Sequence, residues 1–271
     1  MIAHPDHSVN AAFLLASASP RRRDLIKLVG LPVETTSADI DEVPLPDEQA
    51  DEMAQRLSLE KAQAVTSFTP ALRAGASVTP PSAFILVTSD TVVSLDGEPL
   101  GKPRDVEEAR LMLRRLRGRV HQVYTAITLI DLQPASVQRA VPGPDPAEHA
   151  AGSGEAPGTS VDGGLSALQM ITDLACSDVP MRNYTDEEIE AYIASGDPFD
   201  KAGAYAIQHD GFRPVENFSG CFANVMGLPL CHVTRSLRQL GVEAPNDVPL
   251  RCQAHIRYEC PVFERILKRN E

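Results

Sequence analysis

Hydroxyl and guanidinium groups gather in one short stretch near the start of this chain. An apolar run at 13–16 is followed by Ser17 and Ser19, then by Pro20 and three consecutive arginines at 21–23. This order predicts a strand, a tight turn and a helix, with Ser19 as the N-cap and Pro20 in the first helical position. Each cation at a helix N-terminus costs roughly 0.3–1 kcal/mol, which an anion bound at the same place would offset. Free N–H groups, hydroxyls and guanidinium groups suit a polyphosphate; the alternative is a solvated basic turn.

A second apolar run leads to a carboxylate. Residues 83–87 form a continuous apolar segment that predicts a buried strand, and Asp90 with Thr91 follows where that strand is expected to end. In α/β folds functional groups gather at such places. A carboxylate there could orient or deprotonate a water, or hold a divalent metal; otherwise Asp90 belongs to a turn or cap. The Asp-x-Asp pattern of haloacid-dehalogenase-type phosphatases is absent, because Val92 occupies its second position.

Three lysines and one glutamate are further candidates. Lys102 lies in a Gly-Lys-Pro sequence, where a lysine beside glycine can act as a point charge toward phosphate, although the spacing of a P-loop is absent. Lys61 lies within a helical pattern and Lys201 within a segment of small residues, and each taken alone is better interpreted as a solvated cation. Glu42 could ligate Mg²⁺ or solvate a loop.

Other chemistries find little support in the chain. The Gly-x-Ser-x-Gly pattern is missing, so no nucleophile elbow is predicted. Cys252-x-x-His255, with Cys260 beyond it, is a weak zinc-like pattern that lacks a convincing fourth ligand. The five cysteines, an odd number without a Cys-x-x-Cys motif, do not suggest a disulfide framework and favour a reducing cytoplasm.

The composition is that of a soluble globular protein, with 43% hydrophobic and 23% charged residues among 271. No apolar run approaches the ~20 residues of a membrane span, and residues 1–10 do not resemble a signal peptide. The net charge is −12, whereas a protein bound to a nucleic-acid backbone usually presents a basic face. We therefore expect a cytoplasmic protein with a small anionic ligand in a local pocket, and neither a membrane nor a nucleic acid as partner.

Strands alternate with helices along the chain, which predicts an α/β architecture. After the unit at 11–30, the expected strands are 33–36, 83–87, 92–95, 121–131 and 167–175. The expected helices are 47–68, 105–118, 185–195 and 227–240, with a loop at 69–82. Asp105 is expected to cap the second of these helices, and Thr185 is expected to open the third with a capping box. The apolar face of the second helix is expected to comprise Leu111, Leu113 and Leu116.

Several segments, taken in order, closely resemble the Maf family of nucleoside triphosphate pyrophosphatases. They are 17–22, 41–42, 60–62, 89–93, 101–103, 200–208 and 224–229, and the resemblance spans about residues 12–241. It implies an α/β/α fold with an elongated mixed sheet and a cleft between two lobes. It also implies hydrolysis of a nucleoside triphosphate to the monophosphate and pyrophosphate, with a divalent metal, Mg or Mn, and water attack at the α phosphorus.

The resemblance also implies roles for individual residues. Asp90 matches the family's proton acceptor, and with Glu42 it would hold the metal. The residues that match positions of base choice are Arg21, Thr91 and Gln208. Those that would surround the triphosphate are Ser17, Ser19, Arg22, Lys61, Lys102 and Lys201.

The pattern Ser-Pro-Arg-Arg with Gln208 looks like the branch that prefers dTTP and UTP, with modified pyrimidine nucleotides as further substrates. A sister branch that acts on 7-methyl-GTP typically has tryptophan where Arg21 stands. The alternatives left open are that sister activity, a pyrophosphatase of the inosine-triphosphate class, and a non-catalytic nucleotide-binding regulator of cell division. The resemblance suggests a homodimer.

The expected organisation is one Maf-like domain at 11–245. Within it, residues 134–166 are rich in Pro, Gly, Ala and Ser and lack Phe, Tyr and Trp, so we expect a disordered insertion in a loop. Residues 246–271 form a C-terminal tail outside the resemblance. The segment 219–223 departs from the family's usual sequence.

Overall fold

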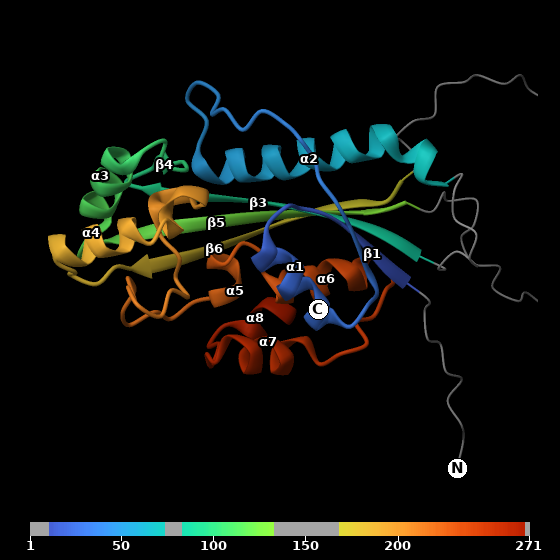
Figure 1. Ribbon diagram of the computed structural model, residues 1–271. Helices are drawn as coiled ribbons and strands as arrows, with labels where there is room; N and C mark the ends of the chain where they lie inside the picture. Colours follow the sequence, from blue (N-terminus) through green and yellow to red (C-terminus); the bar gives the residue numbers. More distant parts are fainter. Residues whose placement is uncertain (1–10, 74–82, 133–167, 269–271) are drawn as a thin grey trace, which may run out of the picture.

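A mixed sheet of six strands forms the centre of the molecule. The computed structural model describes residues 11–73, 83–132 and 168–268; the predicted insertion at 134–166 lies outside the described residues. The strand order is β2-β1-β3-β5-β6, with β4 beside β3. Helix α2 covers one face and α1, α5, α6, α7 and α8 cover the other (Figure 1). This arrangement confirms the expected α/β/α fold with an elongated mixed sheet.

The strands combine parallel and antiparallel pairing. Strand β1 pairs in parallel with β2 and β3, whereas β5 pairs antiparallel with β3 and β6, and β4 antiparallel with β3. Their bounds are β1 Ala11–Ala16, β2 Val33–Thr36, β3 Ala83–Leu95, β4 Glu98–Leu100, β5 Val120–Asp131 and β6 Met170–Pro180. The predicted strand at 167–175 is therefore displaced toward the C-terminus.

Strand β3 is continuous where the sequence predicts two short runs. The expectation that the strand ends before Asp90 is wrong, because the polar side chains there are buried and satisfied. Thr88 Oγ1 donates to the carbonyl of Ser58 at 2.7 Å, and Ser89 Oγ donates to the carbonyl of Gly227 at 2.8 Å. Hydrogen-bonded hydroxyls can be buried in a strand at little cost.

Part of one edge of β3 is unpaired, between the segment that pairs with β1 and the segment that pairs with β4. The pairing with β1 reaches Val87, and the pairing with β4 begins at Val93. Among the described residues no strand pairs with that edge in between, while β5 pairs with the opposite edge. Asp90 therefore lies at the carboxyl end of β1, where α/β sheets form their crevices.

The helices begin largely where the capping residues predict. Asp105 accepts from the backbone N–H of Glu108 at 2.8 Å, and Thr185 forms a complete capping box with Glu188. Ser19 occupies the N-cap position of α1 as expected, but its side chain makes no capping hydrogen bond. The helices are α1 Pro20–Ile26, η1 Lys27–Val29, α2 Ala50–Arg73, α3 Val106–Leu116, α4 Asp186–Ala194, η3 Asp197–Asp200, η4 Ala202–Ala204, α5 Phe222–Val225, α6 Leu230–Gln239, α7 Val248–Ile256 and α8 Phe263–Leu267.

Two details of the helices differ from the expectation. Helix α2 continues to Arg73, so the first part of the predicted loop at 69–82 is helical. Leu111 is 58% exposed, and the buried face of α3 consists instead of Ala109, Met112, Leu113 and Leu116. These four residues follow the i, i+3, i+4, i+7 spacing of a helical stripe, from which Leu111 is displaced.

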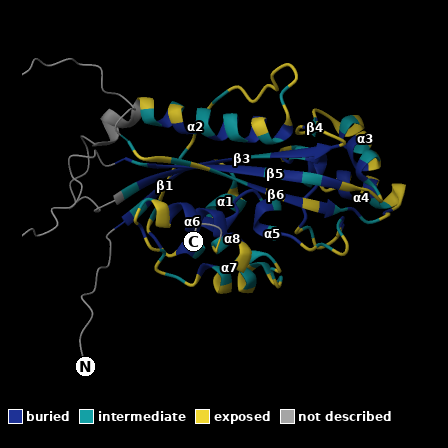
Figure 2. Cartoon of the chain, turned by 180° about the vertical axis from the view of Figure 1, so that it is seen from behind, coloured by how far each residue is buried: buried dark blue, intermediate teal, exposed yellow. Residues whose placement is uncertain are grey.

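The hydrophobic core has two large clusters, at opposite ends of the long strands. One cluster packs Phe13 and Leu25 against α6, and the other packs Leu113 and Tyr184 with α4. The strands themselves are largely buried and the outer helix faces exposed (Figure 2). The described part of the predicted tail contains two short helices, α7 and α8, and α7 packs on the first cluster through Val248.

Candidate active site

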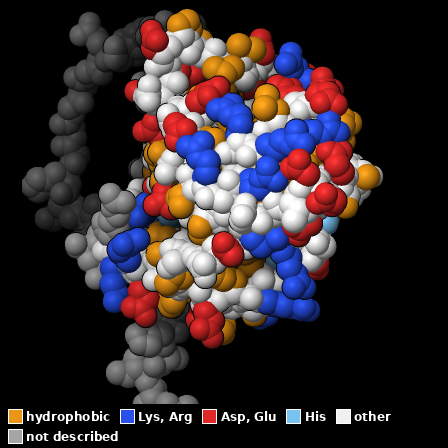
Figure 3. All heavy atoms as spheres, turned by 90° about the vertical axis from the view of Figure 1, so that its left-hand side faces the viewer, with side chains coloured by type: hydrophobic (Ala, Val, Ile, Leu, Met, Phe, Trp, Pro, Cys, Tyr) orange, Lys and Arg blue, Asp and Glu red, His pale blue; other side chains and the backbone are white. Residues whose placement is uncertain are grey.

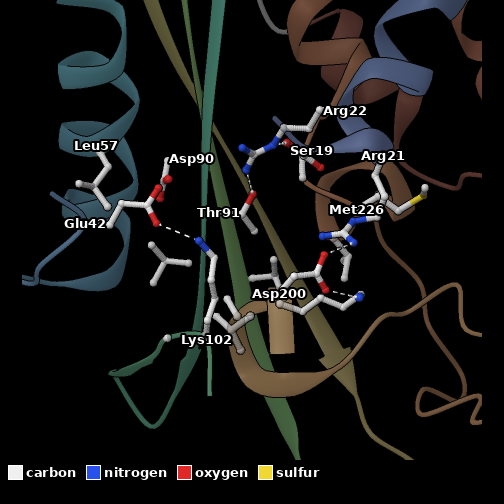
Figure 4. A pocket seen from close by; sticks show the side chains of 18 of the residues that line it. Ser19, Arg21, Arg22, Glu42, Leu57, Asp90, Thr91, Lys102, Asp200 and Met226 are labelled. Carbon is white, nitrogen blue, oxygen red and sulfur yellow. Dashed lines mark hydrogen bonds and ion pairs between the residues drawn. The ribbon is translucent and has the colours of Figure 1, made fainter. Parts of the chain in front are cut away.

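A cavity of about 710 Å³ lies beside the unpaired edge of β3, between the two ends of the long strands. Its walls come from the β1–α1 turn, α2, β3, the loop after β4, η4 with the following segment, and the segment after α5. The volume lies within the range of small-ligand sites. Every side chain that the sequence singled out for substrate or metal lines this cavity: Ser17, Ser19, Arg21, Arg22, Glu42, Lys61, Asp90, Thr91, Lys102, Lys201 and Gln208. Figure 4 labels Ser19, Arg21, Arg22, Glu42, Asp90, Thr91 and Lys102 among them. The structure thus brings them all together, while their individual roles stay predictions.

The cavity carries a surplus of positive charge in a chain whose net charge is −12. Two arginines and three lysines line it, against the carboxylates of Glu42, Asp90 and Asp200. At the end of the molecule formed by α3 and α4, by contrast, cations and carboxylates are interspersed (Figure 3). The local excess favours an anionic ligand inside the cavity.

Lys61 joins the two acids that the sequence assigns to metal binding. Its Nζ lies 2.5 Å from Asp90 Oδ1 and 2.7 Å from Glu42 Oε1. The side chains of Lys61 and Asp90 are each only 9% exposed. Helix α2 presents the lysine and β3 the aspartate, and the loop before α2 contributes the glutamate. Two carboxylates thus converge on one cationic centre at the unpaired edge of the sheet.

Glu42 also reaches the outer rim of the cavity. Its Oε2 accepts from Lys102 Nζ at 3.1 Å (Figure 4). Burial by itself would raise the pKa of the Glu42 carboxyl, but hydrogen bonds and charges from Lys61 and Lys102 outweigh it and lower the pKa to about 2. Glu42 is therefore ionised at neutral pH.

Arg22 is held by neutral groups. Its Nε donates to the carbonyl of Gly227 at 2.8 Å, and its Nη2 donates to Thr91 Oγ1 at 2.9 Å. Burial lowers the pKa of Arg22, and the charge of Asp90 opposes that effect. Gly227 has φ +101°, and a Cβ there would lie 3.1 Å from Arg22 Nε. The position therefore demands glycine on grounds of both backbone and space.

Arg23, the third arginine of α1, finds a hydrogen-bond acceptor beside the helix N-terminus. Arg23 Nε donates to the carbonyl of Ser17 at 3.1 Å, and Ser17 Oγ accepts from the backbone N–H of Ser19 at 3.2 Å. These bonds relieve part of the repulsion that the sequence predicts for three cations beside the helix N-terminus.

Asp197 and Asp200 form ion pairs with two further cations, Arg21 and Lys201. Arg21 lies 3.6 Å from Asp200, and Lys201 Nζ contacts Asp200 Oδ1 at 2.5 Å and Asp197 Oδ1 at 2.9 Å. Sequence reasoning missed both aspartates as site residues. Asp200 is adjacent to Lys201 in the chain, and that adjacency is the signal that could have found it.

A divalent metal fits the donor set of this cavity. Glu42 and Asp90 place carboxylate oxygens around one point that Lys61 already marks as favourable to a cation. Mg²⁺ is typically bound by one or two carboxylates together with substrate phosphates, so two protein ligands suffice. The described residues contain no group of three His, Cys, Asp or Glu side chains arranged to hold a metal, either in this cavity or at the weak Cys252–His255–Cys260 pattern.

Comparison with known proteins decides the family. The family model for Maf-like proteins matches residues 12–144 and 159–240. The chain belongs to this family. The match includes every residue that lines the cavity, and it ends before α7 and α8.

Relatives in the Maf-like family cover almost the same length. A protein of Thermomicrobium roseum is 38% identical over 92% of this chain and 93% of its own length. Proteins of Chromobacterium violaceum and a Geobacter species are 37% and 36% identical over 85% and 86% of this chain, covering 96% and 97% of their own lengths. All three are named dTTP/UTP pyrophosphatase. Among the described residues, no helix combines the length and apolar character that crossing a bilayer requires.

Proposed function

We propose that this chain hydrolyses nucleoside triphosphates, dTTP and UTP in particular, to the monophosphate and pyrophosphate. The observation that carries the proposal is the cationic cavity in which a buried carboxylate, Asp90, faces Lys61. The names of the relatives specify the substrate class, and the family match covers the cavity.

Binding of the triphosphate falls to the cations of the cavity. Arg22 is rigidly placed by Gly227 and Thr91 and can offer its remaining N–H groups to phosphate oxygens. Lys102 is 57% exposed at the rim, where it can swing from Glu42 to an arriving phosphate. When Lys102 exchanges the Glu42 carboxylate for a phosphate, its charge stays compensated throughout.

The hydrolytic step falls to Asp90. A water oriented by its carboxylate attacks the α phosphorus, and the aspartate takes the proton as the new P–O bond forms. The bond between the α phosphorus and the bridging oxygen breaks, and pyrophosphate leaves with the electron pair. A divalent cation, Mg or Mn, held by Glu42 and Asp90 would supply charge neutralisation for the phosphate oxygens. Positioning and electrostatic stabilisation carry most of the catalysis in phosphoryl chemistry.

Base choice is assigned to the wall formed by Arg21, Thr91 and Gln208. Thr91 Oγ1 lies 3.0 Å from Thr125 Oγ1 and also accepts from Arg22, so its orientation is well defined. Arg21 forms an ion pair with Asp200 at 3.6 Å. The proposal also includes a homodimer, which the resemblance suggests, and a cytoplasmic location, which the cysteine usage favours.

A substrate panel tests the proposal. The purified chain is incubated with Mg²⁺ and, separately, dTTP, UTP, GTP, 7-methyl-GTP and inosine triphosphate, and pyrophosphate is measured. Pyrophosphate from dTTP and UTP well above that from the purines supports the proposal. Preference for 7-methyl-GTP or inosine triphosphate would instead indicate the sister activity or a pyrophosphatase of the inosine-triphosphate class. Nucleotide binding without pyrophosphate release would indicate a non-catalytic nucleotide-binding regulator.

A further inference from the structure

Four of the five cysteines surround one small internal void, outside the nucleotide cavity. The void measures about 20 Å³ and is lined by Cys221, Cys231, Cys252 and Cys260. They come from the residue before α5, from α6, from α7 and from the segment between α7 and α8. Residues up to 39 positions apart in the chain thus meet where the C-terminal helices close on the core.

The four thiols are not equivalent. Burial raises the pKa of Cys231 and of Cys252 to about 12, so both stay protonated and unreactive. For Cys260, the hydrogen bond from Cys221 and backbone N–H groups of Val262 and Phe263 outweigh burial and lower the pKa to about 6. The same hydrogen bond, together with burial, raises the pKa of Cys221. Cys260 is therefore the more acidic thiol of the pair, and its Sγ lies 3.9 Å from the carbonyl oxygen of Gly220, the residue before Cys221.

Cys260 is also accessible. It is half-buried, and it also lines an open surface hollow together with Glu264, Arg265 and Lys268. Cys221 is buried behind it and is only 7% exposed. A small oxidant can reach the first thiol through the hollow, whereas the second does not line the hollow.

We propose that Cys260 and Cys221 form a redox-active thiol pair that reacts with hydroperoxides. The Cys260 thiolate attacks the O–O bond, which gives a sulfenic acid and, after protonation of the leaving oxygen, water or an alcohol. The Cys221 thiol then attacks that sulfur and releases a second water, leaving a disulfide. The peroxide gains the two electrons that the two thiols lose.

The disulfide would fasten the C-terminal helices to the floor of the nucleotide cavity. Cys221 directly precedes α5, which leads to the Gly227 carbonyl that holds Arg22 and Ser89. Tyr258 already ties the same region to the tail, since its hydroxyl contacts the backbone of Phe218 and Gly220. The bond would close a loop of about 40 residues, enough to stabilise the fold measurably.

Peroxide treatment of the full chain tests the pair. After exposure to stoichiometric hydrogen peroxide, peptide mapping should show Cys221 linked to Cys260, with Tm raised by roughly 5 °C. Dithiothreitol should reverse both changes. Cys260→Ser should abolish both, and Cys176→Ser, at an exposed cysteine outside the cluster, should abolish neither.

A second variant keeps the proposal testable if Cys260→Ser fails to fold. In Cys221→Ser, or Cys221→Ala if the serine variant is unstable, Cys260 should proceed to sulfinic acid because the resolving thiol is gone. Three results would overturn the pair: preferential oxidation of Cys176, a disulfide between Cys231 and Cys252, or a stoichiometric metal ion that the Cys260→Ser variant loses.

Discussion

Lys61 and Asp90 lie 29 positions apart in the chain, yet their side chains meet at 2.5 Å in the wall of the nucleotide cavity. Each is 9% exposed, so neither charge is compensated by bulk water. The pair places the ammonium group of Lys61 against the Asp90 carboxylate, to which we assign proton transfer.

Loss of the lysine should therefore affect both stability and turnover. Lys61→Met leaves Asp90 buried without its partner, and breaking a buried pair costs about 3–5 kcal/mol. Urea denaturation should show this loss, and pyrophosphate release should fall about 100-fold or more. Lys27→Met, at an exposed ion pair with Asp24, is the matched control and should change neither quantity appreciably. Equal stability of the two variants would show that the Lys61–Asp90 contact contributes little.

Gly227 should resist substitution because of its neighbours as well as its backbone. Gly227→Ala introduces a Cβ 3.1 Å from Arg22 Nε and 3.2 Å from Thr91 Oγ1, at φ +101°. We expect weaker triphosphate binding and a loss of about 1–3 kcal/mol in stability. Gly97→Ala shares the positive φ, at +84°, but has no atom within 4 Å of the added Cβ. It should lose stability and keep its affinity for dTTP, and an equal loss of affinity in both would contradict the assignment.

Lys102 should discriminate between nucleotides by their phosphate chain. Lys102→Ala removes a rim cation that the proposal places on the β and γ phosphates, so affinity for dTTP should fall more than affinity for dTMP. Isothermal titration at two salt concentrations measures both, because an exposed charge is screened by salt. Equal weakening of the two ligands would argue against a phosphate contact.

His121 should make the fold sensitive to mild acid. Burial lowers the pKa of its imidazole to about 4, against an opposing charge from Asp178. The unfolded chain takes up the proton near pH 6.5, so this contribution is complete above pH 6.5 and is lost as the pH falls toward 4. The loss amounts to about 3 kcal/mol in the free energy of unfolding. Denaturation at pH 7, 5.5 and 4 should show a smaller decline in His121→Gln than in the parent chain.

Local rules predicted much of the fold. The caps at Asp105 and Thr185 depend on residues three positions apart, and the structure confirms both. The continuity of β3 was not predictable in this way, because Thr88 and Ser89 read as a loop until Ser58 and Gly227 are placed beside them.

For the candidate site too, the sequence predicted some features and not others. Residue types and order indicated which side chains belong to one cavity. The pairing of Lys61 with Asp90 and Glu42, and the role of Asp197 as anchor of Lys201, depend on contacts between segments that no local pattern encodes.

Turnover by Asp90→Asn tests the central claim most directly. The amide keeps the size of the side chain but cannot accept the proton of an attacking water, so dTTP should still bind while pyrophosphate release falls about 100- to 1,000-fold. Glu107→Gln, an exposed carboxylate on α3, serves as the control and should retain full activity. Parent-like pyrophosphate release by Asp90→Asn, with dTTP and Mg²⁺ present, would contradict the account.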